Sequence, residues 1–115
     1  MAASAIVHIG DGHFTPGPRN TERYRALDQI IDECIGLPGL GAWAWPGDIF
    51  DARSATEDRN ALDARFSRMA SVAPVVIGAG NHDAKDDLKG FGNLGAAHPI
   101  YVVDEAPQVL RIRLA

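Results

Sequence analysis

Three short polar clusters carry the residue types that could do chemistry in this chain. They read DGH from residue 11, GDIFD from residue 47 and GNHD from residue 80. Carboxylate, imidazole and amide groups are ligands for divalent ions, and none of the clusters contains a thiolate. This donor set suits Mn²⁺, Fe or Zn²⁺ better than a structural zinc, and carboxylates from two clusters could hold two ions about 3.5–4 Å apart.

The clusters follow segments that would bring them together. Residues 5–9, 40–45 and 75–79 are apolar runs that predict strands. Apolar residues recur at helical spacing over residues 20–35 and 54–73, which predicts a helix after each of the first two strands. This alternation predicts an α/β fold with a parallel β-α-β-α-β core and right-handed crossovers. Because the carboxyl ends of such strands meet at one edge, the three clusters can converge.

Two further strands are expected in the C-terminal part, at residues 100–103 and 109–114. In the second, Leu110, Ile112 and Leu114 alternate with arginines, a pattern typical of a half-buried strand. We expect residues 1–115 to form a single domain, since this length supports one core but not two.

The composition of the chain limits which kinds of partner and location can be expected. The net charge of −4 argues against an extended nucleic-acid-binding face, but not against an enzyme that reaches phosphodiesters through bound cations. The arginines of the second helix alternate with acids, so they predict a solvated face. Trp43 and Trp45 alternate before a strand end and indicate core residues in preference to a base-stacking platform. No apolar run reaches the roughly 20 residues needed to cross a membrane, so a cytoplasmic location is expected.

Two positions within the clusters suggest specific roles. Asp48 is the best candidate to bridge two ions, because the preceding Gly47 lets the backbone turn sharply at the strand end. His82 directly follows Asn81, so if Asn81 binds a metal, the imidazole would be held beside the ion. It could then protonate a leaving group.

In this order and at these spacings, the clusters resemble the first three motifs of the calcineurin-like metallophosphoesterase superfamily: Asp-x-His, Gly-Asp-x-x-Asp and Gly-Asn-His-Asp/Glu. The wider sequence, including IVHIGDGHF and HPIYVVDEAP, is similar to the nuclease domain of SbcD-type DNA repair exonucleases. The likeness covers essentially the whole chain. It implies a fold that is half of a metallophosphoesterase sandwich, without the C-terminal histidine motifs.

The resemblance also implies a ligand set. Asp11 and His13 would bind the first ion, Asp48 would bridge both ions, and Asn81 would bind the second. The implied ions are two divalent cations, with Mn²⁺ preferred and Fe or Zn²⁺ as alternatives.

Four other residues receive roles from the same resemblance. His82 would assist the phosphate transition state or the leaving group, and Asp83 would orient its ring. Asp51 and His8 would support the ligands from outside the metal's own shell. The implied reaction is metal-assisted hydrolysis of DNA or another phosphodiester. The implied partners are an ATPase subunit, a complementing chain or further copies of this chain.

Members of the family complete the two-metal site with later histidines, one in a separate motif and two in a Gly-His-x-His motif. His98 is the only histidine after His82, and it is followed by Pro99, so a structural or surface role is expected for it. From the protein the second ion would have only Asp48 and Asn81. We therefore expect this site to bind weakly or to stay empty.

Three interpretations remain open. The chain is part of a split or truncated nuclease whose missing ligands come from another polypeptide. Alternatively, it is a degenerate member that acts as a metal-binding or protein-interaction module. In the third interpretation the motifs are inherited without activity, which the retention of every ligand in three motifs disfavours. The intact GNHD sequence favours catalysis, whereas the missing histidines favour a module.

Overall fold

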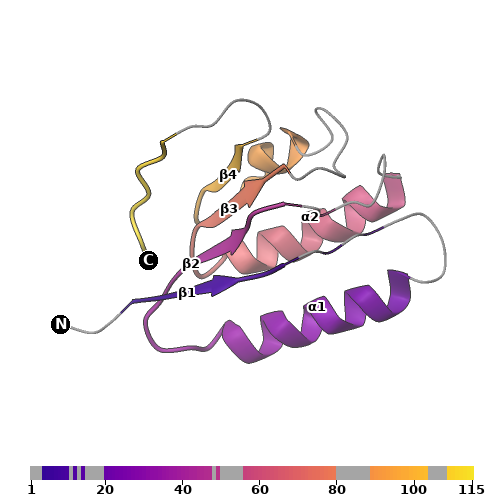
Figure 1. The fold of residues 1–115 in the computed structure, drawn as a ribbon, viewed down its shortest axis with the longest axis horizontal. Helices are drawn as coiled ribbons and strands as arrows, with labels where there is room; N and C mark the ends of the chain where they lie inside the picture. Colours follow the sequence, from indigo (N-terminus) through magenta and orange to yellow (C-terminus); the bar gives the residue numbers. More distant parts are fainter. Residues whose placement is uncertain are drawn as a thin grey trace.

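The computed structural model describes residues 4–10, 12, 14, 20–47, 49, 56–79, 89–103 and 109–115. The elements in chain order are β1 (Ala5–His8), α1 (Asn20–Cys34), β2 (Leu40–Trp45), α2 (Thr56–Ala70), β3 (Val75–Gly78), the 3₁₀ helix η1 (Lys89–Asn93) and β4 (Ile100–Val103). Figure 1 shows the strands as one layer beside the helices. The α/β fold expected from the sequence is confirmed.

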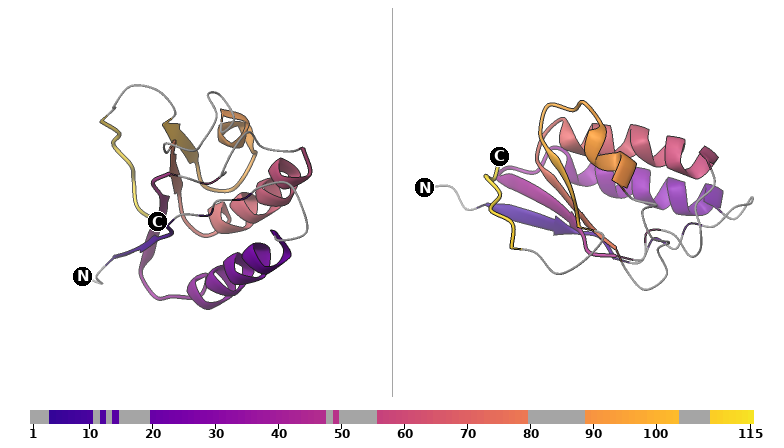
Figure 2. Two further views of the ribbon diagram at one scale, coloured as in Figure 1. Left: turned by 45° about the vertical axis from the view of Figure 1, so that its right-hand side comes forward. Right: turned by 90° about the horizontal axis from the view of Figure 1, so that it is seen from above.

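The sheet has the order β1-β2-β3-β4, and all three neighbouring pairs are parallel. Each right-handed crossover moves one place in the same direction, so α1 and α2 must lie on the same face of the sheet. Both views in Figure 2 show this arrangement. Because α1 follows β1 and α2 follows β2, both helices begin near the carboxyl ends of the strands.

The core lies between the sheet and its helices. Register places Val7, Trp43, Val75 and Ile100 in one row across the four strands. Side chains in such a row share a face of the sheet, and Trp43 and Val75 are completely buried there. The two tryptophans are core residues as predicted, since Trp45 is also only 1% exposed.

The apolar face predicted for the second helix is confirmed. Leu62, Phe66 and Met69 of α2 are completely buried. The Phe66 ring lies edge-on to Trp45 at 5.9 Å and to Phe91 of η1 at 4.7 Å, distances typical of favourable aromatic pairs. Together, these rings join sheet, helix and η1 into one core.

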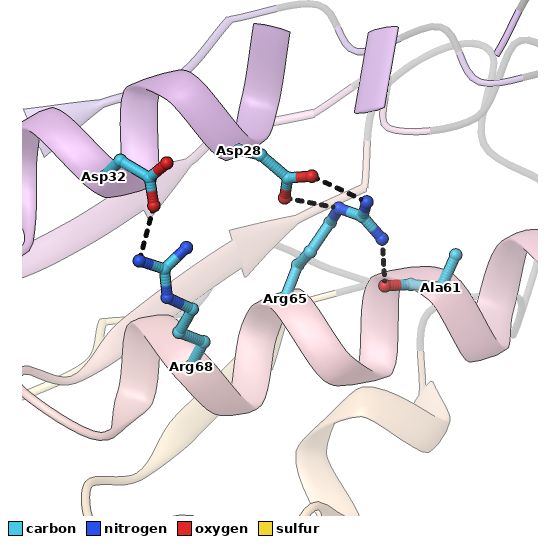
Figure 3. A network of polar contacts seen from close by, with 5 residues as sticks. All are labelled: Asp28, Asp32, Ala61, Arg65 and Arg68. Atoms are coloured by element: carbon cyan, nitrogen blue, oxygen red, sulfur yellow. Dashed lines mark hydrogen bonds and ion pairs between the residues drawn. The ribbon is translucent and has the colours of Figure 1, made fainter. Parts of the chain in front are cut away.

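Ion pairs join α1 and α2 along their polar sides. Arg65 binds both carboxylate oxygens of Asp28 at 2.9 Å, and Arg68 approaches Asp32 at 2.5 Å (Figure 3). Arg65 also donates to the carbonyl oxygen of Ala61. Both arginines are therefore paired with acids of the neighbouring helix. Arg68 is exposed, as predicted for a solvated face, whereas Arg65 is half-buried.

One prediction about the C-terminal part is wrong. Residues 109–114 form no strand, although residues 100–103 form β4 as expected. The Leu114 side chain lies over Gly41 of β2, and Ala115 donates its N–H to the Gly41 carbonyl. Gly41 is the extra residue of a bulge, because Ala5 pairs with Leu40 and Ile6 with Ala42. The end of the segment thus contacts β2 and does not pair as a strand at an edge of the sheet. An alternating pattern predicts a strand only where a partner strand is available.

Candidate active site

The carboxyl ends of β1, β2 and β3 meet at one edge of the sheet, as parallel pairing requires (Figure 1). Backbone bonds continue the ladder past the strand ends: Ile9 donates to Ala44 at 2.8 Å, and Ala79 donates to Val103 at 2.9 Å. The three polar clusters of the sequence directly follow these ends. The shared edge is therefore the candidate site.

Most of the expected site residues lie outside the described residues: Asp11, His13, Asp48, Asp51, Asn81, His82 and Asp83. Within the described part of the chain, no group of three His, Cys, Asp or Glu side chains could hold a metal ion. His8 is described, as the last residue of β1, and its side chain is exposed. Its supporting role and the roles of the others stay predictions.

A backbone hydrogen bond joins the first two ligand loops. The N–H of Phe14 donates to the carbonyl oxygen of Ile49 at 2.8 Å, and both side chains are buried. In the sequence, Phe14 directly follows His13 and Ile49 directly follows Asp48. The structure therefore brings together the chain segments next to two ligands that lie 48 − 13 = 35 residues apart.

Gly12, between Asp11 and His13, lies against the indole of Trp45. A Cβ atom at this position would be 2.5 Å from Trp45 Cζ2 and 3.0 Å from Phe14 Cε2. Real Cβ atoms do not approach so closely, and Trp45 is buried in the core, so its ring has little freedom to move. Only glycine lets the first loop pack this closely onto the end of β2.

The second and third loops begin in a similarly close approach. A Cβ atom at Gly78 would be 2.9 Å from the Pro46 carbonyl oxygen, which belongs to the backbone and cannot rotate away. Gly47 has a φ of 155°, which is strained for residues with a side chain. The chain bends at Gly47, as expected before Asp48, and the ends of β2 and β3 lie close together.

His98 lies at the other edge of the sheet. Its N–H donates to the carbonyl oxygen of Ala70, the last residue of α2, and β4 begins two residues later at Ile100. Because β4 is parallel to β3, its amino end faces away from the candidate site. This position agrees with the structural or surface role expected for His98.

A small cavity of about 140 Å³ adjoins the first loop. Its lining includes Gly10, Gly12, Trp45 and the guanidinium-bearing side chain of Arg23. Trp45 Nε1 is buried and has no hydrogen-bond partner among the described residues. Sequence reasoning did not single out this cavity, since its walls come from the loop after β1, from α1 and from β2, which only the tertiary fold brings together.

A buried polar cluster, which sequence reasoning also missed, links the starts of α1 and α2. Asn20 Nδ2 donates to Asp58 Oδ1 at 2.8 Å, and the Tyr24 hydroxyl donates to the same oxygen at 2.5 Å. Asn20 and Asp58 are only 4% and 6% exposed. Only the positions of Asn20 and Asp58 could have indicated this cluster, because each lies in the first turn of a helix that follows a ligand loop.

The cluster raises the pKa of Tyr24. Burial is the main cause, and the hydrogen bond to Asp58 and the charge of that residue act in the same direction. In the unfolded chain the hydroxyl loses its proton above about pH 10, whereas in the folded chain it keeps it. The unfolded state then binds fewer protons, so the free energy of unfolding falls as pH rises above that point.

We expect this loss of stability to depend on the Tyr24 hydroxyl. In urea titrations at about pH 9 and about pH 11, the free energy of unfolding should fall more in the wild type than in Tyr24→Phe. Equal losses in the two proteins would show that Tyr24 ionises normally in the folded chain.

Comparisons with known proteins agree with this fold. The sequence matches a family described as calcineurin-like phosphoesterase over residues 4–109. Among solved structures, it is similar to the Pseudomonas putida nuclease MPE, with 25% sequence identity and a TM-score of 0.50. The similarity covers 91% of this chain but 48% of that one, so the chain spans about half the length of the nuclease. No curated protein matches the chain.

Proposed function

The chain belongs to the calcineurin-like phosphoesterase family, and from this premise we propose that it is a metal-dependent phosphodiesterase that acts on DNA. The observation that best supports this proposal is the close approach of the described residues that lie beside the three motifs in the sequence. Phe14 bonds to Ile49, Gly12 packs on Trp45, and Gly78 packs on Pro46. These contacts lie next to the expected ligands in the sequence.

The donor set fits the proposed ions. Asp11, His13, Asp48 and Asn81 offer carboxylate, imidazole and amide groups, which bind Mn²⁺-class cations. Gly12 and Gly78, which lie beside the ligand-bearing segments, pack so closely on their neighbours that a side chain would not fit at either position. When bound, divalent ions would supply positive charge to the phosphoryl oxygens and activate water.

The remaining residues are proposed to transfer a proton or to support the groups that do the chemistry. His82 donates a proton to the leaving oxygen, and Asp83 holds its imidazole in the productive orientation. Asp51 and His8 support the ligands by hydrogen bonds. An SbcD-type nuclease is the proposed branch of the family, while an ATPase subunit, further copies of the chain and a cytoplasmic location stay predictions.

The experiment that tests this function compares metal binding with hydrolysis. The wild type is expected to bind Mn²⁺ in calorimetry and to cleave bis-p-nitrophenyl phosphate and linear DNA only when Mn²⁺ is present. Asp48→Asn should weaken Mn²⁺ binding by at least about tenfold, since the bridging carboxylate is lost. Asp32→Asn makes the same chemical change at an exposed α1 residue and should leave binding unchanged. Negligible heats for wild type and Asp48→Asn alike would contradict the metal site.

A second candidate function is a metal-binding subunit that works with a complementing chain. It is favoured by the share of the nuclease that the chain spans, 48%, and by the apolar side chains exposed on and beside the sheet. Ile6 is 60% exposed on β1 and Val109 is 96% exposed. In this case Mn²⁺ binds, but cleavage by this chain requires a second polypeptide that carries a Gly-His-x-His segment.

In the parts of the chain that the structure describes, no helix is long and apolar enough to span a membrane.

A further inference from the structure

We infer that Tyr24 and Asp58 are positioning residues that hold the first two ligand loops in register, an assignment that rests on the proposed function. Neither residue belongs to a ligand motif, and neither is expected to touch an ion or substrate. They would act through the chain segments beside His13 and Asp48.

The first step is the bond between the two helix starts. Asn20 is the first residue of α1 and Asp58 lies in the first turn of α2, at the carboxyl edge of the sheet (Figure 1). Their side chains meet at 2.8 Å in a buried setting. A bond to a buried carboxylate is costly to break, because the lost donor is not replaced by water. The pair therefore fixes the distance between the points where the two loops enter their helices.

Tyr24 extends this link to the first loop. Its hydroxyl donates to Asp58, and its ring stacks on Phe14 with a centroid separation of 4.7 Å and an interplanar angle of 18°. Phe14 in turn donates its N–H to Ile49 of the second loop. The contacts form a closed circuit from Asp58 through Tyr24 and Phe14 to Ile49, and the chain itself then leads from Ile49 back to Asp58.

Arg65 of α2 restrains Tyr24 further. The guanidinium carbon lies over the tyrosine ring, 4.5 Å from its centroid. Its orientation is fixed by the paired bonds to Asp28 and by the bond to the Ala61 carbonyl oxygen (Figure 3). Tyr24 is thus held by groups on α2 as well as by Phe14, so it transmits the position of α2 to the first loop.

The polar character of this cluster argues for positioning beyond general stability. Burying a carboxylate carries a desolvation cost, and apolar side chains of similar size often stabilise a fold as well or better. Directional bonds, in contrast, specify one arrangement of the two loops. Phosphodiester hydrolysis with bound ions requires such an arrangement, since ligands on two loops must keep a fixed separation.

Tyr24→Phe is the sharpest test, because it removes the hydroxyl and keeps the ring that stacks on Phe14. We expect the Mn²⁺ dissociation constant, measured by calorimetry on folded protein, to rise about tenfold, as for loss of other supporting groups around metal sites. Asp58→Asn keeps an oxygen at the position that accepts both bonds, so its dissociation constant should stay within about threefold of wild type. Circular dichroism would verify folding of each variant.

Trp43→Phe is the matched control. It removes a buried indole N–H that donates to the Met69 carbonyl at 2.9 Å, next to the end of α2 and away from the candidate site. It should lower the melting temperature at least as much as Tyr24→Phe does, yet leave Mn²⁺ affinity unchanged.

The Mn²⁺-binding measurements distinguish failure of the positioning role from failure of the proposed function. If the wild type binds Mn²⁺ and Tyr24→Phe binds it equally well, the positioning role is wrong and the proposed function stands. If Trp43→Phe weakens binding as much as Tyr24→Phe, the effect is one of general stability and the positioning role is again wrong. A wild type that binds no Mn²⁺ would overturn both the function and the positioning role.

Discussion

Replacing His82 by alanine is expected to lower kcat for phosphodiester cleavage by about 10³-fold, within the range of roughly 10²- to 10⁴-fold for loss of a general acid. The leaving oxygen would then depart without a proton from the protein. Mn²⁺ affinity should stay close to that of the wild type, because His82 is proposed to lie beside the ions and not to bind them. The measurements are the initial rate of bis-p-nitrophenyl phosphate hydrolysis at saturating Mn²⁺ and the heat of Mn²⁺ binding.

His98→Ala is the matched control for this experiment. His98 lies at the amino end of β4, at the edge of the sheet opposite the candidate site. Its loss should change neither kcat nor Mn²⁺ affinity. If His82→Ala hydrolysed the substrate at the wild-type rate, His82 would not be the general acid. If that variant lost Mn²⁺ binding, His82 would be a metal ligand instead.

Gly12→Ala is expected to reduce both stability and metal binding. The new methyl group would meet Trp45 Cζ2 at 2.5 Å, and this indole is packed in the core against the Phe14 and Phe66 rings. The loop must therefore move, at a cost of about 1–3 kcal/mol in the free energy of unfolding. Because Asp11 and His13 flank this residue, we expect Mn²⁺ affinity to fall by about 10- to 100-fold. Urea unfolding and calorimetry measure the two effects.

Gly10→Ala provides the control in the same loop. Among the described residues, a Cβ atom at Gly10 meets nothing within 4 Å, so this variant should resemble the wild type in stability and in Mn²⁺ binding. In the double variant with Trp45→Phe, the ring atom that clashes is absent, and Gly12→Ala should lose much of its effect on binding. Equal behaviour of Gly12→Ala and Gly10→Ala would contradict the proposed fit.

The positions of the strands and helices were predictable because their signals are local. The strands differ from the expected ranges by at most one residue, and even there the hydrogen bonds of Ile9 and Ala79 continue the ladder. Helix α2 buries the apolar face that its 3.6-residue period predicts. The alternating segment at residues 109–114 was misjudged, since a strand requires hydrogen bonds to a partner strand as well as a pattern.

The sequence by itself determined the order of the elements and the chemical types of the proposed ligands. Periodicity, glycines at strand ends and the grouping of acids with histidines are all written along the chain. Only the tertiary structure decided how the loops are held. The bond from Asn20 to Asp58 joins residues 38 positions apart, and the packing of Gly12 on Trp45 likewise depends on which surfaces meet. Such contacts have no local pattern, because they arise from the distance between elements after the core has packed.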